Sequence, residues 1–468
     1  MTTLARMPEA DRPLREPPRL SAAERFLRDA LEVKDSPSRI RVVTFAAPVA
    51  NASSILALAG KGTGLFFDAP DESTYAALGA AAEIRVAGEG RFAALRQATA
   101  SLFAGLAEVR EPGVAAPAPR LFGGLAFAPG VDHGEAWAGF GDGLFVLPRW
   151  VYSTSGERAS LSFAVGAGYD PKEVDRAIHE LGQLWDRLLE RAAPSRSRPR
   201  TTRVEHLPFE AWSTAVDAIR EAIREGSVAK VVAARRATVE LDGAPAPEAI
   251  LERLKARFPL CTCFALLRDG AAFVGATPER LVERRGAVVT TEALAGSIAR
   301  GRAADLLSSL KDREEHRLVV DAIVEGLTPF CTRVTVGSEP RIRDLPNLLH
   351  MQTPIEGRAR DGVDVLELVK ALHPTPAVGG VPTVEAMRWI VEREAAPRGW
   401  YGAPFGWVDA SGDGAFVVAL RSGVVRGDRV FVYAGAGIME GSSPIAEYEE
   451  TALKMQALLG ALDEDQGA

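Results

Sequence analysis

The sequence predicts an α+β fold. Upstream of residue 192, short apolar runs at residues 41–47 and 143–152 alternate with stretches of helical periodicity at 92–109 and 173–191. Downstream, an amphipathic helix is followed by a β-branched strand and an apolar hairpin. Strands and helices mixed in this way are typical of sheets that carry helices on their faces.

Length and composition exclude several classes of protein. The 468 residues are enough for two or three domains or one large mixed fold. Hydrophobic residues at 47% and charged residues at 25% are ordinary for a globular protein, which argues against a disordered or fibrous chain. The net charge of −7, without a block of basic residues, argues against binding to nucleic acid or to an anionic membrane.

The cysteines and the N-terminus indicate the compartment. Cys261, Cys263 and Cys331 form no CxxC pair and have no nearby histidine pair, so we expect buried, reduced thiols. Residues 1–30 mix Arg, Glu, Asp and Pro without an apolar segment, unlike a signal peptide. No apolar run approaches the roughly 18 to 20 residues of a membrane span. We therefore expect a cytoplasmic protein.

One change in composition divides the chain. Residues 192–206 are rich in Pro, Ser and Arg and are predicted to form a surface connection. With the Pro-rich start of the chain, this predicts an N-terminal tail over residues 1–30, a first part over 31–200 and a second part over 201–465. No internal repeat is found at the period of a solenoid or propeller.

The second part contains elements that the residue pattern assigns in order. A helix is predicted over residues 208–226, where apolar residues recur at helical spacing and Gly226 follows as its end. A strand is predicted over 228–241, and a hairpin over 261–283 with its turn at Asp269-Gly270. Two further helices are predicted over 306–327 and 444–462, the latter beginning at Pro444.

Two single residues stand where acid and base chemistry is feasible. Lys230 lies among valines and alanines in a predicted strand, and burial favours the neutral lysine that can act as a base. Glu279 follows a hydrophobic strand at a Pro turn, where a carboxyl group can stay protonated and serve as a general acid. The alternatives are a lysine that extends to the solvent at the strand edge and an exposed turn carboxylate.

Two carboxylate pairs and a glycine pair complete the candidates. Asp312 and Glu315 share one face of a predicted helix, and Glu447 and Glu450 have the same spacing on the last helix. Such oxygen ligands suit Mg²⁺. The alternatives are solvated helix faces and favourable charge at a helix N-terminus. Glycines at 435 and 437 would let backbone amides approach an anionic ligand.

Taken together, these segments resemble the chorismate-binding enzyme family across residues 205–460, with the pieces in the family's order. The matching pieces are KVVAAR at Lys230, ATPERL at Glu279, TEALAGS, KDREEH, LHMQTPIEG, LHPTPAVGGVP, RGWYGAPFGW, ALRSG at Arg421, AGAGI and EYEETALK. The first part resembles the family's variable N-terminal region only loosely. The resemblance implies one large α+β fold like that of anthranilate synthase component I, with two sheets in a sandwich flanked by helices around a deep site.

The resemblance also implies residue roles. Lys230 would activate the attacking water and Glu279 would protonate the departing hydroxyl group. Glu315 and Glu450 would bind Mg²⁺, with Asp312 and Glu447 acting through water. The implied substrate-binding residues are Gly296, Ser297, His350, Thr375, Tyr401, Arg421, Gly435, Gly437 and Lys454. A dianionic substrate such as chorismate requires fixed cations and donors of this kind.

Within the family, the motifs are most similar to isochorismate synthases of the menaquinone type. Lys230 argues against ammonia-using anthranilate synthases, so no glutaminase subunit is expected. Ala295 stands where aminodeoxychorismate synthases carry a nucleophilic lysine. Asp312 departs from the Glu of salicylate synthases. A salicylate synthase, which would also eliminate pyruvate, and an inactive chorismate-binding relative remain as alternatives, and the pathway served, menaquinone or siderophore, stays open.

Overall fold

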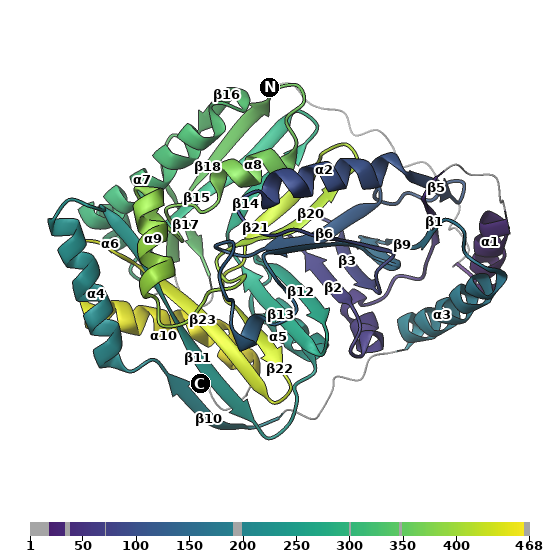
Figure 1. Ribbon diagram of the computed structural model, residues 1–468, viewed down its shortest axis with the longest axis horizontal. Coiled ribbons are helices and arrows are strands. Elements are labelled where there is room, and N and C mark those ends of the chain that lie inside the picture. The colour runs from purple at the N-terminus through teal and green to yellow at the C-terminus, as the bar shows by residue number, and fades with distance from the viewer. Residues whose placement is uncertain are drawn as a thin grey trace, which may run out of the picture.

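The computed structural model describes residues 18–32, 38–70, 72–190, 199–298, 301–345 and 349–462. Within these ranges the chain forms two large, mainly antiparallel sheets that pack against each other, with helices on their outer faces (Figure 1). The predicted α+β sandwich is therefore confirmed. No helix among the described residues combines the length and apolar character that a membrane span requires.

The first sheet contains 13 strands within the described ranges. In spatial order they are β10 (Thr201–His206), β11 (Lys230–Leu241), β23 (Arg429–Ile438), β22 (Ser422–Arg426), β13 (Ala271–Thr277), β12 (Thr262–Arg268), β2 (Gly64–Asp68), β3 (Thr74–Leu78), β8 (Trp150–Ser155), β9 (Arg158–Gly166), β1 (Ile40–Ala46) and β5 (Leu106–Arg110), with β19 (Gly380–Val381) paired to β11.

The second sheet contains 10 strands within the same ranges. They run in the order β16 (Cys331–Val336), β18 (Leu349–Ala359), β15 (Val288–Ile298), β14 (Arg280–Arg285), β21 (Gly414–Val418), β20 (Pro404–Asp409), β6 (Arg120–Leu125), β7 (Gly143–Leu147) and β4 (Ala82–Arg85), with β17 (Arg341–Asp344) paired to β18. Because β2 pairs with β12 and β6 with β20, both parts of the chain contribute to both sheets. The two parts therefore form one fold.

Helices cover the outer faces in two groups. The first sheet carries α1 (Leu20–Glu32), the 3₁₀ helix η1 (Ala52–Ala59), α3 (Pro171–Leu189), α5 (Pro247–Arg257) and α10 (Pro444–Leu462) in one core cluster. The other cluster joins α2 (Arg91–Ala104), α4 (Phe209–Arg224), α7 (Leu310–Leu327), α8 (Val365–Leu372) and α9 (Thr383–Arg393) to the second sheet and to β11. The short helices α6 (Ala303–Ser308) and η2 (Glu135–Trp137) complete the set.

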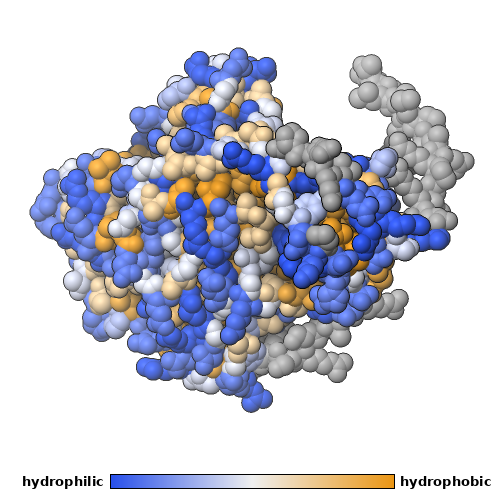
Figure 2. Space-filling view, turned by 45° about the vertical axis from the view of Figure 1, so that its right-hand side comes forward, coloured by the Kyte–Doolittle hydropathy of each residue, from blue (hydrophilic) through white to orange (hydrophobic). Residues whose placement is uncertain are grey.

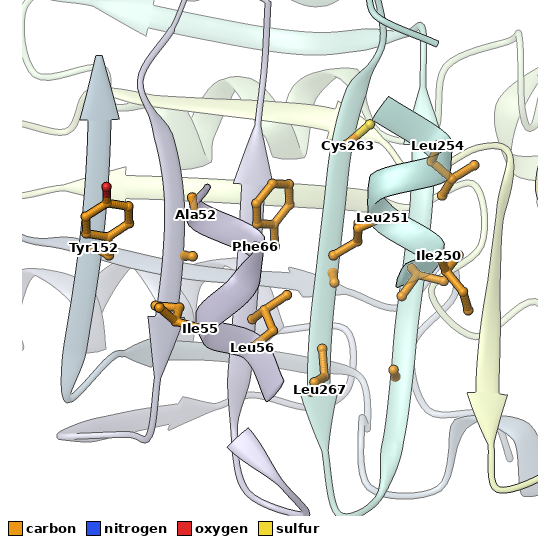
Figure 3. Packing of buried hydrophobic residues seen from close by; sticks show 14 of the residues in the cluster. Ala52, Ile55, Leu56, Phe66, Tyr152, Ile250, Leu251, Leu254, Cys263 and Leu267 are labelled. Carbon is orange, nitrogen blue, oxygen red and sulfur yellow. The ribbon is translucent and has the colours of Figure 1, made fainter. Parts of the chain in front are cut away.

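The interior between the sheets is aromatic. Phe67 and Phe264 from the first sheet contact Phe405 from the second, with ring centroids 6.5 and 4.9 Å apart. On the outer face of the first sheet, η1 and α5 lie side by side and point Ile55 and Leu251 at the strands (Figure 3). On the face shown in Figure 2, hydrophilic side chains predominate and hydrophobic side chains form separate patches.

Several predicted elements differ from those observed. The helix predicted over 306–327 is two helices, because Ser309 adopts extended backbone angles and its hydroxyl accepts from Asp312 N at 3.2 Å to cap α7. The helix predicted over 92–109 ends at Ala104 before Gly105, and β5 follows as a partner of β1. The apolar run at 143–152 is divided between β7 in one sheet and β8 in the other.

Two predicted irregular segments contain regular structure. The predicted tail over residues 1–30 includes most of α1, so the tail prediction is wrong for this helix, whose Leu27 and Leu31 are buried against the first sheet. The end of the predicted connection over 192–206 is β10, which pairs with β11. Residues 1–17 and 191–198 lie outside the described ranges. By contrast, the last helix matches its predicted bounds, and the three cysteines are buried and free as expected.

Candidate active site

Most of the predicted site residues surround one cavity of about 300 Å³. The predicted residues that line it are Glu279, Gly296, Asp312, Glu315, His350, Tyr401, Arg421, Gly435, Gly437, Glu447, Glu450 and Lys454. Lys230 contacts the lining through Glu315, and Thr375 is buried beside Glu279. The Ser297 side chain lies outside the described set, although its backbone pairs with His350 across β15 and β18.

Lys230 is the first residue of β11, and its side chain is fully buried (0% exposed). Its Nζ lies 2.7 Å from Glu315 Oε1 on α7. A Cβ atom at Gly437, on the adjacent strand β23, would lie 2.8 Å from both Glu315 Oε1 and Lys230 Cε. A larger residue at 437 would therefore displace this ion pair from its present position. The Lys230 side chain is buried, so the alternative of a lysine that extends to the solvent is wrong.

Glu279 lies between β13 and β14, where the backbone leaves the first sheet for the second. Its N–H donates to Thr277 Oγ1 at 3.2 Å and its carbonyl accepts from Val418 N at 3.0 Å. Burial, followed by the nearby Glu292 carboxylate, raises the pKa of Glu279 to about 8, although Lys230 and Lys454 oppose this rise. The carboxyl group therefore carries a proton near neutral pH and can donate it, and the alternative of an exposed turn carboxylate is wrong.

Four carboxylates line the cavity from two helices. Asp312 and Glu315 come from α7, and Glu447 and Glu450 come from α10. Glu447 is only 5% exposed, and Glu450 accepts from Lys454 Nζ at 2.7 Å. Hard oxygen donors around a polar cavity fit Mg²⁺ chemically. In the described residues, however, no three metal-binding side chains stand close enough together to enclose an ion.

Arg421 presents a cationic donor to the cavity. It is 6% exposed, and its Nη2 donates to His350 Nε2 at 2.8 Å. Burial and the neighbouring Arg421 hold the pKa of His350 well below its usual value, so this imidazole is neutral and accepts. Nη1 of Arg421 is buried and makes no hydrogen bond within the described part of the chain. A buried cationic group with a donor that the described residues leave without an acceptor is suited to bind an anionic ligand.

Tyr401 and Lys454 extend this polar wall. The Tyr401 ring stacks on Tyr433 with centroids 5.4 Å apart, and burial raises the pKa of Tyr401, which keeps the phenol as a donor. Lys454 Nζ donates to Gly435 O at 2.9 Å. Burial acts against the charge of Lys454, but the Glu450 carboxylate prevails and raises its pKa. Together with Arg421, these residues supply cationic and neutral donors to one cavity.

Two residues near the reacting groups were not predicted. Arg398 lines the cavity, and Glu292 is the charged neighbour that raises the pKa of Glu279. Arg398 lies in the segment RGWYGAPFGW and Glu292 in the segment TEALAGS, and both segments belong to the family resemblance. The spacing of Glu394 and Arg398, four residues apart, was a signal for an ion pair, but a spacing does not reveal which backbone groups such a pair contacts.

Comparison with known proteins gives the family. A profile of the family described as "Chorismate binding enzyme" matches residues 26–463. The salicylate biosynthesis isochorismate synthase of Pseudomonas aeruginosa is 36% identical over 420 residues, which cover 86% of each chain. The isochorismate synthase MenF of Bacillus subtilis is 34% identical over 354 residues, 74% of each chain.

A solved structure agrees on the fold. The menaquinone-specific isochorismate synthase MenF of Escherichia coli superimposes with a TM-score of 0.79 at 24% identity, covering 95% of this chain and 100% of that chain. The predicted resemblance is thus confirmed by profile, relatives and fold. With the family profile matched over nearly its whole length and a site assembled from the family's motifs, this chain belongs to the chorismate-binding enzymes.

Proposed function

We propose that this chain is an isochorismate synthase that converts chorismate to isochorismate with bound Mg²⁺. The observation that carries the proposal is the pairing, around one cavity, of a buried lysine with a glutamic acid whose pKa is raised to about 8. A base and a protonated acid in the same site are the groups that an addition of water coupled to loss of hydroxide needs. The relatives named above are isochorismate synthases, which supports the same activity.

The reaction would add the hydroxyl group of a water molecule at C2 of the ring and release the hydroxyl group from C4. Lys230 would take a proton from a water molecule while the oxygen of that water forms a bond to C2. Both ring double bonds shift, from C1=C2 to C1=C6 and from C5=C6 to C4=C5, as the C4–O bond breaks with its electron pair and Glu279 gives its proton to the departing hydroxide to form water. The ring product is isochorismate, and one water is consumed and one released. No ammonia is used, so no glutaminase subunit is required.

The remaining residues of the cavity would bind the two carboxylates of chorismate. Arg421 and the Tyr401 hydroxyl would bind one carboxylate, helped by backbone amides near Gly435 and Gly437. Arg421 would use Nη1, which has no hydrogen bond to the described residues. Glu315 and Glu450 would hold Mg²⁺, with Asp312 and Glu447 through water. When bound, the ion would neutralise the charge of the other carboxylate. Ion pairs now occupy Glu315 and Glu450, so we expect metal binding to compete with Lys230 and Lys454 for them.

The test is a product assay with purified protein, chorismate and Mg²⁺. We expect chorismate to disappear and isochorismate to accumulate, and a lactate dehydrogenase coupling to detect no matching pyruvate. Release of salicylate and pyruvate at the rate of chorismate loss would favour a salicylate synthase instead. For a variant of Lys230, the matched control is Lys255→Ala. Lys255 pairs with Asp68 on the first sheet and does not line the cavity.

A further inference from the structure

Among the residues that the structure describes, no strand neighbours strand β11, which begins at Lys230, along part of one edge. On one side it pairs continuously with β23, from Val231 to Glu240. On the other side, among the described residues, it pairs with β19 only at its first two residues and with β10 only from Ala237 onward. Between these two partners, the backbone groups of Val232 and Ala234 face the open edge.

An ion pair fills this gap. Arg398 Nη2 donates to Val232 O at 2.8 Å, and Ala234 N donates to Glu394 Oε1 at 2.9 Å. Val232 N donates to Gly379 O at 2.8 Å on the same edge. Arg398 also donates through Nε to Glu394 Oε2 at 2.8 Å. In a complete sheet, a neighbouring strand would form the hydrogen bonds of the Val232 carbonyl and the Ala234 amide. Here the side chains of Arg398 and Glu394 form them in place of a strand.

The same pair connects the other walls of the cavity. Arg398 Nη1 donates to Val378 O at 2.7 Å, in the loop whose Thr375 is buried beside Glu279. Tyr401 N donates to Arg398 O at 2.9 Å, which ties the turn that carries the phenol to the same residue. The guanidinium lies 4.2 Å from the centre of the Phe127 ring. One arginine thus joins the strand of Lys230, this loop and the turn of Tyr401.

Burial shows that the pair is internal, not a surface contact. The Arg398 and Glu394 side chains are 3% and 6% exposed. Removing one partner of a buried ion pair leaves an uncompensated charge, whereas the intact pair here has its hydrogen bonds satisfied. Although Arg398 lines the cavity, its donors Nε, Nη1 and Nη2 already serve Glu394, Val378 and Val232, and its charge is balanced by Glu394. It is therefore poorly placed to bind a substrate carboxylate.

We propose that Glu394 and Arg398 are positioning residues, which hold Lys230 and Tyr401 in the geometry that turnover requires by replacing a strand on the open edge of β11. The proposal deepens the proposed function and rests on it. A positioning role predicts a loss in kcat, because a small displacement of the base from the reacting atoms slows the chemical step. Substrate binding should change little.

The experiment compares Arg398→Lys and Glu394→Gln with the wild type. Lysine keeps the charge of Arg398 but offers one nitrogen, which cannot contact two carbonyls and a carboxylate together. We expect kcat with chorismate and Mg²⁺ to fall about 10- to 100-fold in both variants, as for other residues that orient reacting groups. KM should stay within about threefold of the wild type. The matched control is Asp413→Asn, which breaks the Arg284–Asp413 pair away from the cavity.

Hydrogen exchange gives a second readout that does not depend on turnover. The amide of Ala234 loses its charged acceptor in Glu394→Gln. Peptides that cover the start of β11 should therefore exchange faster than in the wild type in both variants, and at the wild-type rate in Asp413→Asn. A wild type without activity on chorismate would refute the proposed function, and the exchange data would still test the positioning role.

Three results would overturn the proposal. The first is a rise in KM with kcat unchanged, which would make Arg398 a substrate-binding cation. The second is a kcat loss no larger than that of Asp413→Asn. The third is unchanged exchange of the β11 peptides in both variants, which would show that the pair does not hold this edge.

Discussion

The raised pKa of Glu279 predicts how activity depends on pH. Its value of about 8 stands against a usual 4.5, with burial as the largest cause. A group with this pKa is about nine-tenths protonated near pH 7 and about one-tenth protonated near pH 9. If the protonated form is the general acid, kcat/KM should fall about tenfold over this range once the base is deprotonated. The descending limb should have its midpoint near pH 8.

The assay is a pH series of initial rates with chorismate, with Glu279→Gln as the reference. This variant should lose about 10²- to 10⁴-fold in rate and show no descending limb near pH 8. A descending limb that persists in Glu279→Gln would refute the assignment, because another group would then be responsible. A midpoint near the usual carboxyl value would refute the raised pKa itself.

The same shift affects stability, with a sign that can be checked. Because the folded-state pKa is raised, the protonated carboxyl stabilises the fold fully below pH 4.5, and this contribution is lost as the pH rises toward 8. Within that window the free energy of unfolding of the wild type should fall relative to Glu279→Gln by ~1.4 kcal/mol per pH unit. Denaturant titrations at several pH values measure this difference, and parallel pH profiles would contradict it.

Three further predictions follow from the cavity. Lys230→Ala should lose ~10²- to 10⁴-fold in kcat while Lys255→Ala stays near wild type, and comparable activity of the two variants in rate assays would exclude Lys230 as the base. Arg421→Ala should raise KM by ~10- to 100-fold, the equivalent of a charged hydrogen bond, and an unchanged KM would show that the Arg421 guanidinium does not bind substrate. EDTA should abolish turnover reversibly, and full activity in EDTA would refute a metal requirement. Glu450→Gln should weaken Mg²⁺ binding measured by calorimetry, with a substitution of the exposed Glu449, Glu449→Gln, as the control.

The parts of the fold that follow from local patterns could be predicted from the sequence. The final helix begins at Pro444 and ends where its apolar stripe ends, and the hairpin turns at Asp269-Gly270 as the turn chemistry predicts. The boundaries that failed depend on contacts far along the chain. Strand β10 is polar and exists because β11 offers it an edge, and α1 is held by the outer face of the first sheet.

The candidate site shows the same division. The acidic residues and Arg421 line one cavity, and Lys230 contacts this lining through Glu315. The Lys230–Glu315 ion pair could not be predicted from spacing, because the two residues are 85 positions apart and meet beside Gly437, which leaves room for them. The contacts of Arg398 with the open edge of β11 could not be predicted either, because they depend on where the pairing of β11 with β19 and β10 ends.

The most direct test of the central claim is the fate of the ring oxygen in water enriched in the heavy oxygen isotope. If Lys230 activates water for attack at C2 and Glu279 releases the C4 hydroxyl group, isochorismate formed with Mg²⁺ must carry one heavy oxygen atom at C2, as mass spectrometry of the product can measure. Isochorismate without the label would contradict the addition of water, and salicylate with pyruvate as the main products would contradict the proposed reaction.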